Sequence, residues 1–141
     1  MKNMSVADLR YLSETGHTIG AHTATHQRLS FVRDDERLVD EIVASADWLE
    51  ERLKVRIDHF AFPFGNLASF SRAALQVARS RFQHIYTGMR GDNAESVPSW
   101  AIRRDAITVD DSLHLVGAFL EGAADPRYAR DLRTYESWAQ T

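Results

Sequence analysis

Hydrophobic residues recur at helical spacing in several parts of the chain. The clearest case runs from about Asp34 to Lys54, where apolar residues fall three or four positions apart: Leu38, Ile42, Ala46, Leu49 and Leu53. Acidic residues begin this segment, which favours a helix because they face its positive end. Further helices are predicted on similar grounds over residues 5–16, 69–80, 110–122 and 126–138. The last of these carries an aromatic and apolar stripe, made of Tyr128, Leu132, Tyr135 and Trp138.

Short apolar runs between these helices predict four β-strands, at residues 18–21, 59–62, 84–87 and 101–104. Strands that alternate with helices favour right-handed crossovers and a parallel sheet, so the fold class is α/β. Ligands in such folds bind beyond the carboxyl ends of the strands. Two segments follow strands in this way, His22 to His26 and Pro63 to Gly65. We expect them to be neighbours in space.

Composition narrows the classes of function. The 141 residues suit one domain, and 44% hydrophobic residues suffice for a core. The net charge of −3 argues against nucleic acid or an anionic membrane as a partner. Cysteine is absent, so a metal would have to use the six histidines and oxygen ligands. No apolar run is long enough for a membrane span or a signal peptide, so the compartment stays open, with the cytoplasm as the default.

The two candidate segments each allow two interpretations. His22 and His26, four positions apart, could bind one divalent cation, although paired loop histidines often have no metal and zinc usually takes three or four protein ligands. Pro63-Phe64-Gly65 is either an ordinary tight turn or a turn that presents the backbone N–H of Phe64 to a substrate oxygen.

The order of the motifs resembles the polysaccharide deacetylase family of carbohydrate esterases. After the first helix come Gly16-His17-Thr18-Ile19-Gly20 and then His22-Thr23-Ala24-Thr25-His26, and after the long helix comes Phe62-Pro63-Phe64-Gly65. The likeness runs from about Val6 to Gly65 and more loosely to Asp105. Such a compound signature is far more specific than any of its parts.

The resemblance implies a distorted (β/α) barrel and a hydrolase that removes acetyl groups from N-acetylated carbohydrate. It assigns His22 and His26 to a divalent metal, zinc in many members, and the backbone N–H of Phe64 to an oxyanion hole. Phe62 and Pro63 are expected to contact the substrate, an N-acetylated glycan or a small amide. The metal would polarise the amide carbonyl and acidify a water molecule, and a carboxylate would take the proton.

The sequence lacks parts of the family's pattern. The motif Thr-Phe-Asp-Asp, source of the base and a third metal ligand, should lie upstream of the first helix and does not occur. The Asp-Asp pairs at residues 34–35 and 110–111 begin predicted helices, where the helix dipole explains them. Ala61 and Phe64 stand where the family often has Arg and Tyr. His114 lacks the leucine of the family's acid motif and is predicted to be an ordinary helix residue.

The remaining polar residues near the strands allow simpler roles. His17, His59 and His84 begin strands, the wrong end for catalysis, and are expected to be structural. Arg103, Arg104 and Asp105 follow the fourth strand, where the family often has a functional Arg or Asp; a surface salt bridge is an equal alternative.

We therefore predict one domain over residues 1–141, amino-terminally incomplete: a partial (β/α) barrel of the deacetylase type that lacks its first strands. A barrel usually needs about 250 residues, so four strands cannot close one. Either an upstream portion is missing or another chain completes the sheet, and a homo-oligomer that covers the open sheet edge is one such arrangement.

Three functions stay open at this point. The first is a metal-dependent deacetylase whose carboxylate pair lies outside the sequence, so that the chain alone is inactive or nearly so. The second is a noncatalytic, deacetylase-like carbohydrate-binding or scaffold module with glycan contacts from Phe62, Phe64 and Trp100. The third is an interaction domain that uses the stripe on the last helix, although core packing is the favoured interpretation of that stripe.

Overall fold

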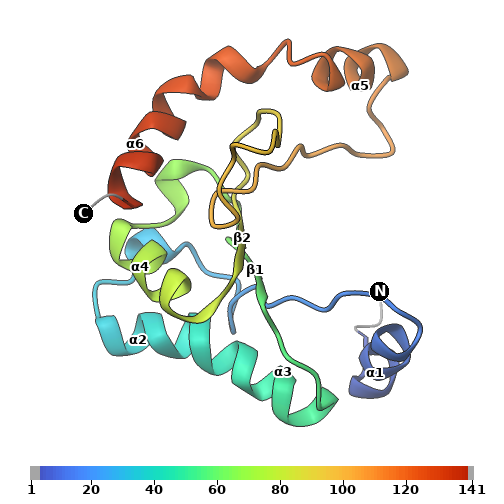
Figure 1. Ribbon diagram of the computed structural model, residues 1–141, viewed down its shortest axis with the longest axis vertical. Coiled ribbons are helices and arrows are strands. Elements are labelled where there is room, and N and C mark those ends of the chain that lie inside the picture. The colour runs from blue at the N-terminus through green and yellow to red at the C-terminus, as the bar shows by residue number, and fades with distance from the viewer. Residues whose placement is uncertain (1–3, 140–141) are drawn as a thin grey trace.

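The computed structural model of the protein describes residues 4–139 (Figure 1). Its elements, in chain order, are α1 (Val6–Glu14), the 3-10 turn η1 (Leu29–Phe31), α2 (Asp35–Val39), the π-helical turn η2 (Asp40–Ala44), α3 (Ser45–Leu53), β1 (His59–Ala61), the 3-10 turn η3 (Leu67–Ser69), α4 (Arg72–Arg81), β2 (His84–Tyr86), α5 (Leu113–Leu120), the 3-10 turn η4 (Asp125–Tyr128) and α6 (Ala129–Ala139). Helices and parallel strands alternate, which confirms the predicted α/β class.

The sheet is parallel and follows the order of the chain. Strands β1 and β2 pair in parallel, with Phe60 opposite Ile85. Ala21 forms a parallel bridge to Phe60, and Ile102 forms one to Tyr86. Four segments therefore lie side by side in the order in which they occur.

The prediction of four strands is correct in position but too generous in extent. Strand pairing at the first segment is limited to Ala21, whose N–H donates to His59 O at 2.8 Å and whose carbonyl accepts from Ala61 N at 3.0 Å. The fourth segment makes a single bridge through Ile102. Among the described residues, each outer segment has a pairing partner on one side only, so fewer ladder hydrogen bonds hold it in register. Within residues 4–139 the sheet stays open, and the predicted barrel is not confirmed.

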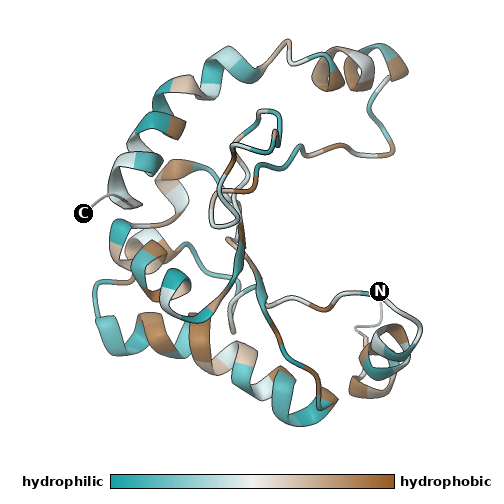
Figure 2. Cartoon of the chain, in the orientation of Figure 1, coloured by the Kyte–Doolittle hydropathy of each residue, from teal (hydrophilic) through white to brown (hydrophobic). Residues whose placement is uncertain are grey.

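The core lies on one face of the sheet, between the strands and the helices that cover them. In Figure 1, α2, α4 and α6 lie to the left of β1 and β2, and α3 runs below them. The side chains of Phe60 and Ile85 point into this core, fully buried, as do Leu38, Ile42 and Leu75 from the helices. Figure 2 shows hydrophobic and hydrophilic residues alternating along these helices, as an amphipathic pattern requires. The hydrophobic effect thus fixes the helices to this face.

The long helix departs from regular α geometry at its centre. The sequence pattern predicts one helix from Asp34 to Lys54, and Asp34 indeed caps it, accepting from Glu36 N at 2.9 Å. Lys54, at φ +58°, ends it in the left-handed conformation. The π-helical turn between α2 and α3 was not predicted, because apolar spacing of three or four residues fits both helix types.

Helix α6 packs against the core, as its stripe predicts. Tyr135 is fully buried, and its hydroxyl donates to Trp100 O at 2.6 Å. Tyr128, Leu132 and Trp138 are partly buried against the same core. The structure therefore favours core packing for this stripe over a surface for another protein.

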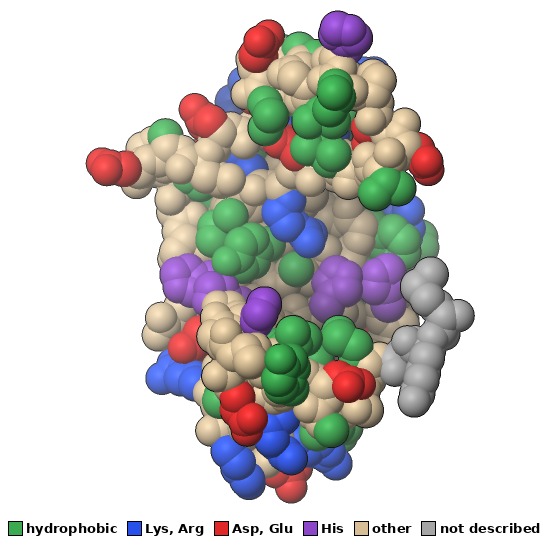
Figure 3. All heavy atoms as spheres, turned by 90° about the vertical axis from the view of Figure 1, so that its right-hand side faces the viewer, with side chains coloured by type: hydrophobic (Ala, Val, Ile, Leu, Met, Phe, Trp, Pro, Cys, Tyr) green, Lys and Arg blue, Asp and Glu red, His purple; other side chains and the backbone are tan. Residues whose placement is uncertain are grey.

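The other face of the sheet is open. In Figure 1, α1 and α5 project beyond the two ends of the strands on the right-hand side, and no helix lies over the strands between them. Figure 3 shows this face directly, with histidine side chains across its middle. No helix in the described part of the chain has the length and apolar character needed to cross a membrane.

Candidate functional site

The two predicted loops meet at the carboxyl ends of the strands. The rings of His22 and His26 have centroids 4.9 Å apart and lie edge to face at 63°. The His26 ring also lies edge to face with Phe64, at 5.1 Å between centroids. The expected proximity of the loop at residues 22–26 and the turn at residues 63–65 is confirmed.

His22 is held in one tautomer by the neighbouring strand. Its Nδ1 lies 2.7 Å from the carbonyl oxygen of Ala61. A carbonyl oxygen can only accept, so Nδ1 carries the proton and Nε2 keeps a free lone pair. This is the arrangement in which metal-binding histidines are oriented by a backbone carbonyl.

The environment also favours the neutral form of His22. Partial burial lowers the pKa of its imidazole below the ordinary value, and electrostatic interactions with His26 and Arg104 act in the same direction. The hydrogen bond to Ala61 opposes this shift in pKa but does not reverse it. A neutral imidazole is the form that binds metals.

The two rings fit a shared divalent metal in their spacing. Two imidazoles that bind one tetrahedral zinc at about 2.0 to 2.1 Å have centroids roughly 5 Å apart, close to the separation seen here. Within residues 4–139, no group of three or more His, Asp or Glu side chains is placed to hold a metal. The described residues thus offer two nitrogen ligands, and a complete site would need a further ligand from elsewhere.

The turn at Pro63-Phe64-Gly65 is unusually tight. Gly65 N–H donates to Pro63 O at 2.6 Å, and Phe64 between them has φ +62°, which is the pattern of a strained γ-turn. The turn packs directly on Gly88, the second residue beyond β2, whose N–H donates to Gly65 O at 2.8 Å. A Cβ on Gly65 would lie 2.3 Å from Gly88 N, so only glycine fits.

The strained turn leaves the Phe64 backbone amide available. None of the described residues accepts a hydrogen bond from this N–H. The nearest N–H groups before and after it, those of Phe62 and Gly65, both donate hydrogen bonds. The Phe64 ring is 51% exposed, and the guanidinium of Arg28 lies over it at 4.4 Å from the centroid. An unpaired donor beside the two histidines is what an oxyanion contact requires.

Arg104 forms hydrogen bonds to the backbone at the ends of two neighbouring strands. Its Nε donates to Thr87 O at 2.7 Å and its NH2 group donates to Phe62 O at 3.1 Å. Burial lowers the pKa of its guanidinium. The alternative of a surface salt bridge fits the neighbouring residue instead, because Arg103 contacts Asp92 and Glu136. Arg104 thus places a positive charge at the candidate site.

Two loop residues in the site adopt costly backbone conformations. Thr23 has φ +62° and His26 has φ +58°. Positive φ is a strong outlier for a β-branched residue such as threonine, and strain of this kind costs on the order of 1 to 3 kcal/mol per residue. One stabilising contact is internal, from His26 N to Thr23 Oγ1 at 3.1 Å.

Glu41 holds this loop from outside, a role that no sequence pattern predicted. Glu41 lies in the π-helical turn and is only 7% exposed. Its Oε1 accepts from the hydroxyl of Thr25 at 2.7 Å, its Oε2 accepts from Thr25 N at 3.0 Å, and its carbonyl accepts from Ala24 N at 3.0 Å. In the sequence it is one of many acids on an acid-rich helix, so no pattern distinguishes it.

Phe62 and Pro63, predicted to contact the substrate, lie largely within the core, although Phe62 also borders the cavity that adjoins His22 and Arg104; their substrate contact stays a prediction. Both residues are buried, and the Phe62 ring stacks on Phe70 at 4.0 Å between centroids. Trp100 packs beside Tyr135 and under the guanidinium of Arg79. The hydrophobic core takes these side chains, so among the aromatic residues proposed for glycan contact Phe64 alone is exposed at the site.

Within the described residues, the other histidines make no ring contact with this pair. His59 and His84 begin β1 and β2, as predicted, and their rings stack at 4.4 Å between centroids. His59 Nδ1 also contacts the hydroxyl of Tyr86 at 2.9 Å. His114 is an exposed residue of α5, which agrees with the prediction. Both Asp-Asp pairs lie at or just before helix starts, also as predicted.

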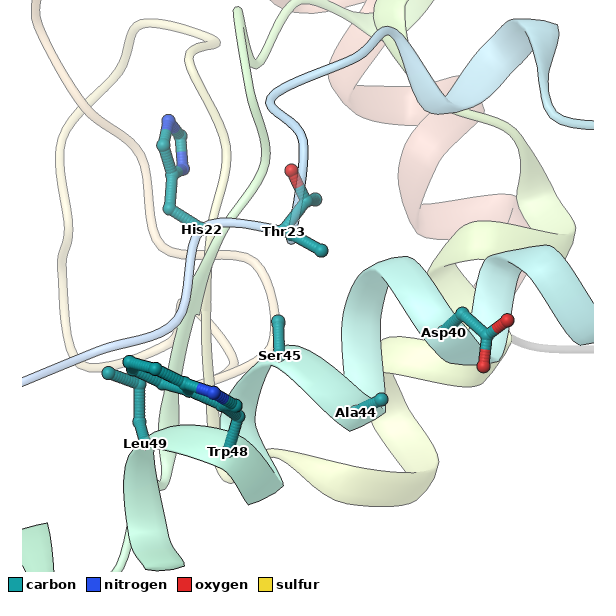
Figure 4. Close-up of a pocket in the computed structure, with 8 residues that line it drawn as sticks. His22, Thr23, Asp40, Ala44, Ser45, Trp48 and Leu49 are labelled. Carbon is teal, nitrogen blue, oxygen red and sulfur yellow. The ribbon is translucent and has the colours of Figure 1, made fainter. Parts of the chain in front are cut away.

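Cavities adjoin the candidate site on three sides, and His22 borders each of them. One of about 270 Å³ lies between His22, Phe64 and Arg104. A second of about 340 Å³ lies on the open face of the sheet. The third, of about 470 Å³, separates the loop at residues 22–24 from the helix that carries Trp48 (Figure 4). The site is therefore accessible to a small ligand.

Fold and site together define an α/β protein with a histidine pair at the carboxyl edge of a parallel sheet. The chain belongs to the polysaccharide deacetylase family, whose model matches residues 2–81, more than half of its length. This confirms the resemblance drawn from the motifs. A comparison with curated proteins gave no significant match.

Solved deacetylases share the fold at low sequence identity. The Streptococcus pyogenes deacetylase PplD, determined in complex with acetate, has a TM-score of 0.70 at 19% identity, over 83% of this chain and 50% of its own. The Bacillus cereus polysaccharide deacetylase BC0361 has a TM-score of 0.66 at 17% identity, over 83% and 36%. The BpsB deacetylase domain of Bordetella bronchiseptica has a TM-score of 0.64 at 19% identity, over 72% and 48%. The chain thus spans half or less of each.

Proposed function

We propose that this chain forms part of a metal-dependent hydrolase that removes acetyl groups from N-acetylated carbohydrate. The observation that carries the proposal is the pair of imidazoles, 4.9 Å apart, beside the unpaired amide of Phe64. Membership in the deacetylase family supports the reaction class. The similar Streptococcus pyogenes deacetylase was solved with acetate, which is the acid that such a hydrolysis would release.

In this proposal the chain's residues have distinct tasks. His22 and His26 hold a divalent metal, zinc in our proposal, through imidazole nitrogens, and Ala61 O keeps His22 in the required tautomer. When bound, such a metal supplies Lewis acidity toward an amide carbonyl and acidifies water. The Phe64 N–H donates to the oxygen that becomes negative during attack, and the fixed charge of Arg104 favours the same negative charge.

The proton acceptor and the further metal ligand are proposed to be carboxylates from outside the described residues. They would come from an upstream segment of the same domain or from a second chain that covers the open sheet edge. The first arrangement completes one barrel-like domain, and the second makes a homo-oligomer. Support comes from the share of the solved deacetylases that this chain spans, 50%, 36% and 48% for the three compared.

The test uses the complete protein and a matched pair of variants. His22→Ala should abolish stoichiometric zinc binding and acetate release from N-acetylated oligosaccharides, whereas His17→Ala, which removes an exposed histidine outside the site, should leave both intact. Metal content is measured by mass spectrometry and acetate by an enzyme-coupled assay. Tight, stoichiometric zinc in the His22→Ala variant would refute the ligand assignment.

The noncatalytic alternative makes a different prediction for the same protein. A carbohydrate-binding module would bind the oligosaccharide without releasing acetate.

Under the catalytic proposal, residues 1–141 alone should show negligible hydrolysis, because two imidazoles without a carboxylate bind zinc weakly and provide no base. Robust turnover by residues 1–141 alone would contradict the proposal that the catalytic carboxylate lies outside these residues.

A further inference from the structure

The loop that carries His22 and His26 lacks regular secondary structure, and its geometry depends on contacts from elsewhere. Thr23 and His26 both have positive φ, so the chain adopts two unfavourable conformations within four residues. Such conformations persist when the surroundings over-determine them. The contact between His26 N and Thr23 Oγ1 fixes one end of the loop to the other but does not attach it to the rest of the protein.

Glu41 supplies that attachment. It makes three hydrogen bonds to the middle of the loop: its two carboxylate oxygens accept from the N–H and the hydroxyl of Thr25, and its carbonyl accepts from Ala24 N. Because Glu41 is 7% exposed, water competes weakly for these bonds. The residues that it holds lie directly between the two histidines.

The π-helical turn makes this contact available. The carboxylate and the backbone carbonyl of Glu41 both reach the loop. Inside an α-helix, a backbone carbonyl normally accepts a hydrogen bond from the amide four residues later and is not available to a loop. In the turn at residues 40–44 the hydrogen-bond spacing is wider, and the Glu41 carbonyl accepts from Ala24. Single π-helical turns within α-helices are frequent at functional sites.

We infer that Glu41 is a positioning residue that sets the separation of His22 and His26 and thereby their joint affinity for a metal. The inference rests on the proposed function where it concerns the metal, and on the hydrogen bonds alone where it concerns the separation of the rings. Glutamine at position 41 could keep both contacts, because its amide oxygen can accept from Thr25 N and its NH2 group can donate to the Thr25 hydroxyl. Leucine, of similar size, removes both acceptors from Thr25 and is therefore the more decisive replacement.

The test compares Glu41→Leu with Glu36→Leu in the 141-residue chain. Glu36 lies in the exposed first turn of the same helix, so its replacement removes the same charge without touching the loop. Nuclear magnetic resonance reports the ring-to-ring contact of His22 and His26 without metal, the exchange rate of the Thr25 amide, and the response of both rings to added Zn²⁺. Urea denaturation of each variant reports global stability separately.

In the Glu41→Leu variant we expect faster exchange of the Thr25 amide, loss of the ring-to-ring contact, and Zn²⁺ affinity reduced by about 10- to 100-fold, as is typical when an outer-shell partner is removed. Glu36→Leu should behave as the wild type. A folded Glu41→Leu variant with unchanged ring contact and unchanged amide exchange would overturn the inference, whatever its stability.

Thr25 provides a second route should Glu41→Leu fail to fold. Thr25 is exposed, so Thr25→Val removes one hydrogen bond to Glu41 with little effect on the core, and Thr25→Ser restores it. Thr25→Val should weaken the ring contact and the Zn²⁺ response, and Thr25→Ser should rescue both; equal behaviour of the two variants would overturn the inference. If the wild-type rings of the 141-residue chain ignore Zn²⁺, the ring contact and the amide exchange still decide the role of Glu41, while the proposed function is decided separately by His22→Ala in the complete protein.

Discussion

Replacing Gly65 with alanine tests the geometry of the Phe64 turn. Gly65 has φ +73°, and an added Cβ would lie 2.3 Å from Gly88 N and 2.7 Å from Gly88 Cα. Both atoms belong to the backbone, so a side-chain rotation cannot relieve the clash. Either the turn or the segment after β2 must move.

The magnitude follows from two separable costs. An alanine in the left-handed region costs roughly 1 to 2 kcal/mol. Overpacking against a neighbour that cannot move typically costs about 1 to 3 kcal/mol more. Gly65→Ala should therefore reduce the free energy of unfolding by about 2 to 5 kcal/mol, the sum of these terms.

Gly16→Ala is the matched control. Gly16 has φ +91°, and an added Cβ there would have no atom within 4 Å, so this variant incurs the backbone cost alone. Urea denaturation of both variants should show Gly65→Ala the less stable by about 1 to 3 kcal/mol. With a urea dependence of about 1 to 3 kcal/mol per molar, a difference of 2 kcal/mol shifts the midpoint by roughly 1 M. Equal midpoints for the two variants would show that the turn does not pack tightly on Gly88.

Three other predictions follow from the packing and from the histidines. Ile42→Ala, at a fully buried position, should lower the free energy of unfolding by about 2 to 5 kcal/mol in urea denaturation. Val39 is 43% exposed on the same helix, so Val39→Ala should change it by about 0.5 kcal/mol or less. Similar losses for the two variants would contradict the assigned core face. Tyr135→Phe should lower the free energy of unfolding by about 1 to 2 kcal/mol in thermal unfolding, because Trp100 O loses its donor. Tyr128→Phe should cost less, because the Tyr128 hydroxyl has no such partner in the described residues. Equal losses for the two variants would argue against that hydrogen bond. Partial burial and the neighbouring His84 lower the pKa of His59 from 6.5, so the unfolded chain binds the proton more readily and stability should fall as the pH decreases through about 6.5. His59→Gln should reduce this loss of stability between about pH 7.5 and 5.5, and an unchanged pH dependence would assign the effect to other groups.

The candidate site was predictable where local sequence controls it. The histidine spacing and the Pro-Phe-Gly turn both follow strand segments, and parallel strands end at the same edge, so the meeting of His26 with Phe64 could be predicted. The burial of Pro63 beside the exposed Phe64 could not, because a turn residue faces core or solvent according to which elements pack against the turn. The sequence alone is compatible with either orientation of these side chains.

Glu41 illustrates what required tertiary structure. The sequence by itself determined the helices, the order of the parallel strands and the family, since apolar periodicity, helix caps and short motifs are local properties. Only the folded chain decided that a π-helical turn would place one acid of that helix under the histidine loop, 16 residues away from Thr25 in sequence. Long-range hydrogen bonds depend on how separate elements pack, and no local pattern encodes that packing.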